Sequence, residues 1–163
     1  MNKKKRRRQV RSNLEIYIDG SCRKDKYGTY GVLVVYPDGT QTVIHGDEEN
    51  TTNNIMEMRA LIAALDHIRE LKLDETYDIT IYCDSQYVVK GLTEWWGKWK
   101  ANGYRSSTGL PIKNLDLWKQ LVGVSKKVKA TLKWVKGHAN NEKHNEIDSI
   151  VFALSERKET VTI

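Results

Sequence analysis

Residues 14–45 read LEIYIDGSCRKDKYGTYGVLVVYPDGTQTVIH. Apolar and β-branched residues gather in three short runs of this stretch, at 14–18, 32–36 and 41–45, and a Pro-Asp-Gly turn signal at 37–39 separates the last two. Runs of this length and composition, bounded by turn residues, are typical of strands joined by short connections. We therefore predict an antiparallel meander of three strands at the start of the folded domain.

The remainder of the chain alternates between helical and strand patterns. We predict a long helix that begins within Thr51–Asn54 and ends near Leu71, a strand at 79–83, a short helix at 85–91, a helix at 114–127, a strand at 131–135 and a closing helix at 142–155. This order indicates an α/β domain with a mixed sheet. We place the domain at 13–157, between a basic disordered tail at 1–12 and a C-terminal tail at 158–163.

Length and composition indicate a single intracellular domain. The 163 residues are enough to bury roughly two-thirds of the unfolded surface in one core. The 2 cysteines are too few for a disulfide framework. The sequence has no run of about 18 apolar residues and no apolar secretion signal at its basic start. We therefore expect a cytoplasmic protein without a membrane span.

The net charge of +6 is concentrated at the N-terminus. Seven of the 27 lysines and arginines lie within 3–11, which leaves 20 basic against 21 acidic residues in 12–163. The body of the domain is thus nearly neutral. The basic segment could increase contact with a polyanion, and a solvated tail or a nuclear localisation signal are the alternatives.

Four carboxylates stand at positions that point to one shared site. Asp19 follows the first strand run and Asp84 follows the strand at 79–83. Glu57 lies one helical turn before Leu61 in the apolar stripe of the long helix, and Asp148 flanks the apolar stripe of the closing helix. Several acids in one place need cations to neutralise them. The pattern therefore indicates a divalent-metal site of the kind used in phosphate chemistry.

Glu57 also has an ordinary explanation. A glutamate near a helix start often interacts with the helix dipole or completes a capping box. Its place on the apolar side of the helix favours the metal interpretation, because burying an unpaired carboxylate costs several kcal/mol.

Short motifs surround the acids. They are YIDGSC at 17–22, TTNNIME at 51–57, CDSQYV at 83–88 and WVKGHA at 134–139, followed by Asp148 ten residues after His138. Together and in this order they resemble type 1 ribonuclease H of the bacterial kind, from about Leu14 to Leu154. The resemblance implies a ribonuclease H-like five-stranded mixed sheet flanked by helices.

The same resemblance implies an activity and a site. The expected reaction is endonucleolytic hydrolysis of the RNA strand of an RNA–DNA hybrid with two Mg²⁺ ions, for which Mn²⁺ substitutes, leaving 5′-phosphate and 3′-hydroxyl ends. Asp19, Glu57, Asp84 and Asp148 are the implied metal ligands, and His138 is the implied mobile histidine that helps to exchange water, protons and product. A lone loop histidine would otherwise be ordinary polar surface.

Two departures from the family pattern stand near Asp148. The usual acid-leucine-alanine after the last aspartate is here Ser149-Ile150-Val151. Asn145 lies three residues before Asp148, where many relatives have an asparagine at four. Because Asp148 and its spacing from His138 are kept, we expect activity to be kept as well.

Substrate contacts are expected in two regions. Between 91 and 113 tryptophans alternate with cations, and the resemblance implies a basic protrusion that grips the DNA strand. Packing on the core is the alternative that we favour for Trp99 and Trp118. Hybrids are recognised by shape, phosphates and 2′-hydroxyls. The substrate-binding residues that the resemblance implies are Cys22 (through its backbone), Thr52, Asn53, Asn54, Gln86, Trp95, Lys98, Lys100 and Arg105.

Two other function classes fit parts of the pattern. A nucleic-acid-binding module without catalysis would bind hybrids and not cut them, but the complete acidic set argues against it. A resolvase- or integrase-like nuclease would prefer all-DNA junctions, but the Gly-His loop and the tryptophan-rich basic segment argue against that class. We expect a monomer that acts on RNA–DNA hybrids.

Overall fold

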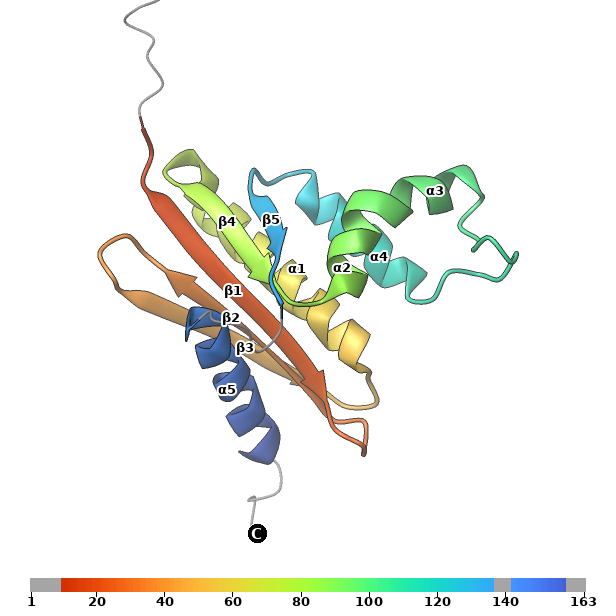
Figure 1. Cartoon of the computed structure of the whole chain (residues 1–163), viewed down its shortest axis with the longest axis horizontal. Coiled ribbons are helices and arrows are strands. Elements are labelled where there is room, and N and C mark those ends of the chain that lie inside the picture. The colour runs from red at the N-terminus through yellow and green to blue at the C-terminus, as the bar shows by residue number, and fades with distance from the viewer. Residues whose placement is uncertain (1–9, 137–141, 158–163) are drawn as a thin grey trace, which may run out of the picture.

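One mixed sheet organises the molecule (Figure 1). The computed structural model describes residues 10–136 and 142–157. The strands are β1 (Asn13–Cys22), β2 (Gly28–Val35), β3 (Gln41–Glu48), β4 (Asp78–Cys83) and β5 (Thr131–Trp134), in the spatial order β3-β2-β1-β4-β5. The β1–β2 and β2–β3 pairs are antiparallel, and the β1–β4 and β4–β5 pairs are parallel. The predicted meander and five-stranded mixed sheet are confirmed.

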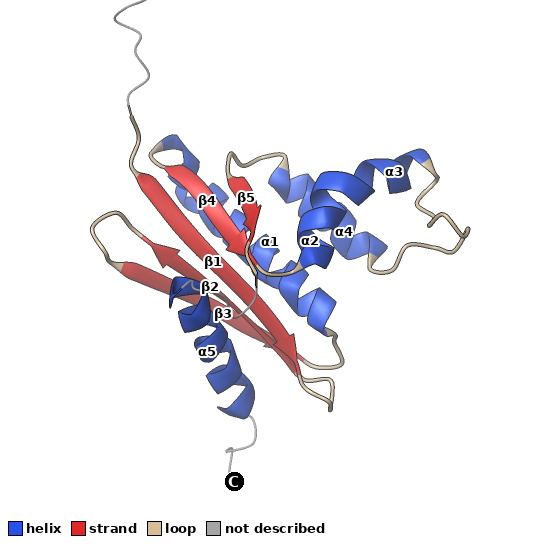
Figure 2. Cartoon of the chain, viewed as in Figure 1, coloured by secondary structure: helices blue, strands red, loops and turns tan. Residues whose placement is uncertain are grey.

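Helices cover both faces of this sheet (Figure 2). They are α1 (Asn53–Leu71), η2 (Leu73–Glu75), α2 (Gln86–Lys90), the π-helical turn η3 (Gly91–Trp95), α3 (Trp96–Ala101), α4 (Leu115–Ser125) and α5 (Glu142–Arg157). In the described residues no helix combines the length and apolar character that a membrane crossing requires. Both cysteines are free thiols.

The alternation of β1 builds two apolar layers. Ile16 and Ile18 belong to the larger core, which α1 and α4 complete with residues such as Leu61 and Trp118. Tyr17 points to the opposite face and packs with Leu33 and with Ile147 and Val151 of α5. Successive side chains of a strand point to opposite faces of the sheet, and residues two apart share a face. Asp19 therefore lies on the α5 side with Tyr17.

The start of α1 follows the predicted capping chemistry. Thr52 is the N-cap, and its hydroxyl oxygen accepts a hydrogen bond from the backbone N–H of Ile55 at 3.2 Å. This bond satisfies one of the free N–H groups of the first turn. The cap fixes where the helix begins, and hence the direction in which Glu57 projects.

Several predicted boundaries are wrong. Strand β2, predicted at 32–36, spans Gly28–Val35, and β3, predicted at 41–45, continues to Glu48. Strand β1 continues past Asp19 to Cys22, because residues 20–22 keep their pairing with β2. The short helix does not end at Gly91 but continues through η3 and α3. Gly91 is a packing glycine, since a Cβ there would lie 2.1 Å from the ring of Trp118. Its missing side chain lets the helix approach α4 and does not stop it.

Candidate metal and nucleic-acid site

Asp19 lies in the body of the central strand. It pairs with Gly31 of β2 and is only 4% exposed. On the same face, the ring of Tyr17 stacks on Tyr82 of β4 with 4.8 Å between the ring centroids. The aspartate is thus held by a strand with partners on both sides, which is a rigid support for a metal ligand.

Asp84 is brought beside Asp19 by the parallel register of β1 and β4. Tyr17 pairs with Tyr82. Asp19 and Asp84 each lie two residues after these tyrosines, so both aspartates are on the same face as the tyrosines. The carboxylate is half-buried, and the indole N–H of Trp134 donates to the Asp84 backbone oxygen at 3.1 Å. The end of β5 therefore helps to fix the backbone of Asp84.

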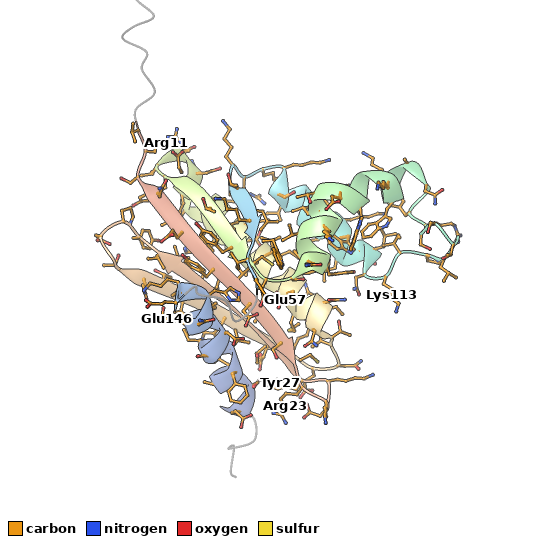
Figure 3. The ribbon with its side chains drawn as sticks, viewed as in Figure 1. Arg11, Arg23, Tyr27, Glu57, Lys113 and Glu146 are labelled. Atoms are coloured by element: carbon orange, nitrogen blue, oxygen red, sulfur yellow. The ribbon has the colours of Figure 1, made fainter. Side chains whose placement is uncertain are left out.

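Glu57 reaches the site from α1 because the helix lies directly against β1 (Figure 3). The backbone N–H of Gly20 donates to Oε1 of Glu57 at 3.1 Å. A Cβ on Gly20 would lie 2.4 Å from the carbonyl carbon of Met56, which no side chain permits. The absence of a side chain at residue 20 is therefore what lets the helix bring Glu57 next to Asp19.

Asp148 completes the group from α5, on the face of the sheet opposite to α1. It lies on α5, which packs on β1 and β2, and its carboxyl group is close enough to that of Asp19 to raise the pKa of Asp19. A hollow of about 440 Å³ opens beside it, lined by Ser21, Asp148, Ser149, Val151 and Phe152. The structure thus brings all four predicted carboxylates together, from β1, from α1, from the residue that follows β4 and from α5.

The electrostatics of the cluster favour bound cations. The pKa of Asp19 is raised well above its usual range by burial, by the neighbouring carboxyl group of Asp148 and by the nearby charges of Glu57 and Asp84. The pKa of Glu57 is raised by burial and by the charge of Asp84, against the opposing effect of the Gly20 N–H. Its Oε2 is buried and has no hydrogen-bond donor among the described residues. Oxygen donors with this excess of negative charge fit Mg²⁺ or Mn²⁺.

This arrangement predicts that the metal-free protein is stabilised by Glu57→Gln. The folded-state pKa of Glu57, about 8, lies above the ordinary 4.5, so the folded protein binds this proton more tightly than the unfolded chain. The free energy of unfolding therefore falls as the pH rises from about 4.5 to about 8. In urea denaturation with EDTA, we expect Glu57→Gln to be more stable than the wild type by roughly 1–3 kcal/mol at pH 8 and about equal at pH 4.

Glu75→Gln, at an exposed position in η2, is the matched control and should leave the pH dependence unchanged. Addition of Mg²⁺ should stabilise the wild type more than Glu57→Gln, because the ion neutralises the buried charge. Equal stability of the wild type and Glu57→Gln at pH 8 in EDTA would mean that the buried charge of Glu57 does not destabilise the metal-free protein.

His144 is a site residue that the sequence interpretation missed. It lies on α5, is 2% exposed, and its Nε2 is 3.7 Å from Oδ2 of Asp84. One ligand atom each from Asp19, Asp84 and His144 lies within 4.8 Å of the others. The available signal was the shifted asparagine, because the position four residues before Asp148 holds this histidine. The predicted mobile histidine, His138, lies outside the described residues.

The predicted minor-groove residues lie around the ends of β1 and α1. The backbone N–H of Cys22 donates to Oδ1 of Asn53 at 2.6 Å, so a hydrogen bond joins the end of β1 to the start of α1. Asn54 and Gln86 are exposed in the first turns of α1 and α2. Thr52 is also exposed while it caps α1. These contacts show how the residues are positioned, and their role in substrate binding stays a prediction.

The predicted protrusion is a helical arm mounted on an aromatic cluster. Trp118 is fully buried and its indole N–H donates to the Tyr87 hydroxyl at 3.0 Å. Trp99 packs edge-on against Trp118 with 5.4 Å between the centroids, and Trp95 lies 5.9 Å from Trp99. The expectation that Trp99 and Trp118 pack on the core is confirmed, and Trp95 is a half-buried member of the same cluster.

The cations of this arm face solvent. Lys98 and Lys100 are exposed on α3. Arg105 is exposed in the loop that follows, and its guanidinium donates to the Gly109 backbone oxygen at 3.0 Å. Figure 1 shows α3 and this loop projecting to one side of the sheet. The tryptophans thus fix the arm to α4 and leave its charges available to a polyanion.

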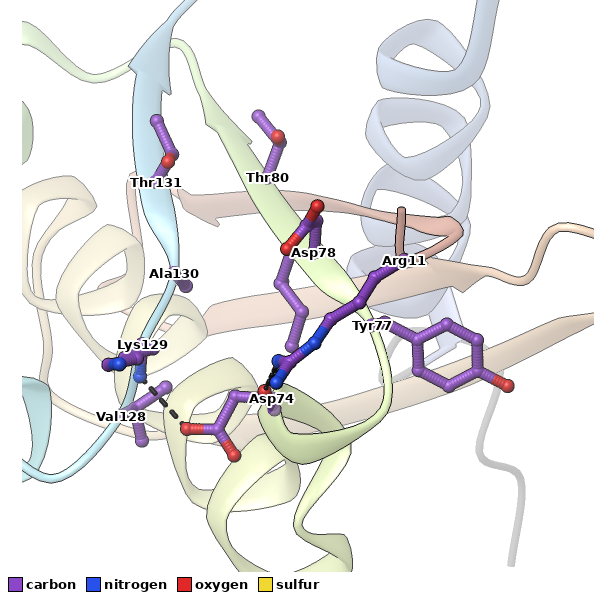
Figure 4. Close-up of a pocket in the computed structure, with 10 residues that line it drawn as sticks. Arg11, Asp74, Tyr77, Asp78, Thr80, Val128, Lys129, Ala130 and Thr131 are labelled. Carbon is purple, nitrogen blue, oxygen red and sulfur yellow. Dashed lines mark hydrogen bonds between the residues drawn. The ribbon is translucent and has the colours of Figure 1, made fainter. Parts of the chain in front are cut away.

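A second hollow, of about 640 Å³, lies at the other end of the strands (Figure 4). Arg11 donates to the backbone oxygen of Asp74 at 2.7 Å, and the backbone N–H of Lys129 donates to Oδ2 of Asp74 at 2.9 Å. These bonds connect the N-terminal segment and the loop before β5 to η2. None of the four carboxylates lines this hollow, so it is separate from the acidic cluster.

Comparisons with known proteins agree with this arrangement. The model of the RNase H family matches residues 11–154. A ribonuclease H of Ehrlichia ruminantium (strain Gardel) is 40% identical over 136 residues, which cover 83% of this chain and 89% of that protein. A ribonuclease H of Francisella philomiragia is 36% identical over 141 residues, covering 86% and 89%.

Solved structures share the fold. The crystal structure of LC9-RNase H1, a type 1 RNase H with the type 2 active-site motif, has a TM-score of 0.73 and 27% identity, and the match covers 91% of this chain and 74% of that one. RNase H1 from the halophilic archaeon Halobacterium salinarum NRC-1 has a TM-score of 0.63 and 24% identity, covering 89% and 99%. At the latter identity the likeness concerns the fold alone.

Proposed function

Because this chain belongs to the ribonuclease H family, which cleaves RNA in RNA–DNA hybrids, we propose that it hydrolyses the RNA strand by a two-metal mechanism that leaves 5′-phosphate and 3′-hydroxyl ends. The observation that carries this proposal is the convergence of Asp19, Glu57, Asp84 and Asp148. Enzymes of this family depend on divalent metal, and the four carboxylates would hold two Mg²⁺ ions, or Mn²⁺ in their place.

The residues of the site would divide the work. Bound divalent ions supply positive charge to the phosphate and lower the pKa of an attacking water. Asp19, at the centre of the cluster, would hold both ions. Glu57, anchored by the Gly20 N–H, and Asp84, whose backbone is anchored by Trp134, would each help to hold one of them. Asp148 on α5, together with His138, would assist the exchange of water, protons and product.

The hybrid would lie across the acidic cluster and the helical arm. Cys22, Thr52, Asn53, Asn54 and Gln86 would meet the minor groove and the adjacent backbones, through polar groups that suit 2′-hydroxyls and phosphates. Trp95, Lys98, Lys100 and Arg105 would contact the DNA strand. We further propose that the protein acts as a monomer in the cytoplasm.

The direct test is Mg²⁺-dependent cleavage of an RNA–DNA hybrid in which each strand carries a different label. We expect cuts in the RNA strand alone, with 5′-phosphate ends, and no cuts in RNA–RNA or DNA–DNA duplexes. Binding of the hybrid with no cleavage in Mg²⁺ or Mn²⁺ would identify an inactive binding module. Preferential cutting of an all-DNA junction would place the chain among DNA nucleases of this fold.

The role of the arm gives a second expectation. The double substitution Lys98→Ala/Lys100→Ala should weaken hybrid binding and reduce the slope of log Kd against log salt by about 1–2, because about 0.9 counterion is released per phosphate contact. The turnover rate at saturating hybrid should stay within about threefold, since neither lysine reaches the acidic cluster. Fluorescence anisotropy over 50–300 mM salt and steady-state kinetics measure the two quantities.

Lys126→Ala/Lys127→Ala is the matched control, because it removes the same charge at the exposed end of α4. We expect it to change the salt slope by less than about half as much. Equal effects of the two pairs would mean that overall charge, and not the arm, determines binding.

A further inference from the structure

His144 joins the acidic cluster as a buried nitrogen donor. It lies on α5 one turn before Asp148, and its side chain is 3% exposed at the point where it meets Asp84. The 3.7 Å between its Nε2 and Oδ2 of Asp84 is longer than a hydrogen bond, for which about 2.7–3.2 Å is usual. The two atoms thus lie at a distance at which both could bind the same metal ion.

The spacing fits two ligands of one ion. Ligand atoms about 2.0–2.2 Å from a metal lie roughly 3–4.4 Å from one another. One oxygen of Asp19, one oxygen of Asp84 and one imidazole nitrogen of His144 all lie within 4.8 Å of one another. Independently, Oε2 of Glu57 is buried without a donor among the described residues, and Glu57 is 8% exposed. Both observations point to a cation at this place.

We propose that His144 binds the divalent ion that Asp19 and Asp84 hold, as a direct nitrogen ligand. This inference rests on the proposed metal-dependent function and adds a donor of a different kind to it. An imidazole favours later transition ions, whereas carboxylates favour Mg²⁺. His144 therefore biases the site toward Co²⁺ and Mn²⁺ relative to Mg²⁺, beyond the preference that carboxylates alone would give.

Pulsed EPR of the Mn²⁺-loaded full-length protein tests the contact directly. Directly bound imidazole nitrogen modulates the Mn²⁺ electron spin echo. We expect this ¹⁴N modulation in the wild type and in His45→Asn, whose histidine is exposed on β3, and its loss in His144→Asn. Bound Mn²⁺ without nitrogen modulation in the wild type, or undiminished modulation in His144→Asn, would overturn the proposal.

Calorimetric titrations separate ligation from a structural effect. His144→Asn should raise the Kd for Co²⁺ by about tenfold or more and the Kd for Mg²⁺ by less than about threefold, because the lost donor is the one that Co²⁺ prefers. His45→Asn should change neither value. Equal weakening for both ions would mean that His144 only supports the fold around Asp84, which contradicts direct ligation.

Hybrid cleavage by the same wild-type samples keeps the two ideas apart. If the RNA strand is cut in Mg²⁺ while the nitrogen signal is absent, the ligand assignment of His144 fails and the proposed function stands. If neither Mg²⁺ nor Mn²⁺ supports any cleavage, the proposed function fails, whatever the EPR spectrum shows.

Discussion

Replacement of Asp19 by asparagine should reduce Mg²⁺-dependent cleavage of the RNA strand by at least about 10³-fold. Asp19 lies near the other three carboxylates, since Glu57, Asp84 and Asp148 all raise its pKa. Asparagine keeps the shape of the side chain and removes the charge. The loss should therefore appear in metal binding and in the chemical step, and circular dichroism should show an unchanged fold.

A matched variant separates this effect from a general loss of charge. Asp116→Asn removes one carboxylate at an exposed position in the first turn of α4, and it should retain cleavage within about twofold of the wild type. Single-turnover assays with saturating hybrid measure both variants. If Asp19→Asn kept more than about a tenth of wild-type cleavage, the carboxylate of Asp19 would not be the central metal ligand that we propose.

Gly20→Ala should have the second largest effect, although residue 20 has no side chain to contribute chemistry. A methyl group there would lie 2.4 Å from the Met56 carbonyl carbon and 2.5 Å from the Glu57 backbone nitrogen. The helix α1 must move away from β1 to make room, and Glu57 moves with it. We expect a loss of stability of about 1–3 kcal/mol and a loss of cleavage of about 100-fold, the cost of misplacing a catalytic group by about 1 Å.

Gly123→Ala on α4 is the control, because a Cβ there meets nothing within 4 Å. It should stabilise the protein by about 0.5–1 kcal/mol and leave cleavage unchanged. Urea denaturation gives both stabilities, and cleavage is compared at a temperature where Gly20→Ala is fully folded by circular dichroism. Wild-type cleavage by a folded Gly20→Ala protein would show that the close approach of α1 is not needed for the site.

The fold was predictable because each strand and helix shows its own periodicity. Leu14, Ile16 and Ile18 alternate with residues of the other face, and the structure gives each set its own apolar layer. Boundaries were less predictable, because they depend on tertiary contacts. Gly91 looks like a helix end in the sequence, but the ring of Trp118, 27 residues later in the chain, occupies the space of its missing side chain.

The candidate site was predictable to the extent that its residues have unusual positions. Glu57 was recognised because an acid stood in an apolar stripe, and the structure buries it there. His144 carries no such mark, because a histidine in the first turns of an amphipathic helix is unremarkable. Its proximity to Asp84 follows only from the packing of α5 against β1 and β2, which the sequence pattern does not specify.

The bond between Arg11 and Asp74 has a practical consequence for protein engineering. It fixes the entry of the chain into the domain at the end of the sheet opposite Asp84. Arg11 and Asp19 are eight positions apart along nearly extended chain, a span of roughly 25 Å. An affinity tag, fluorescent reporter or partner domain fused ahead of residue 10 would thus be tethered away from the reaction centre and leave the hybrid's path to it open.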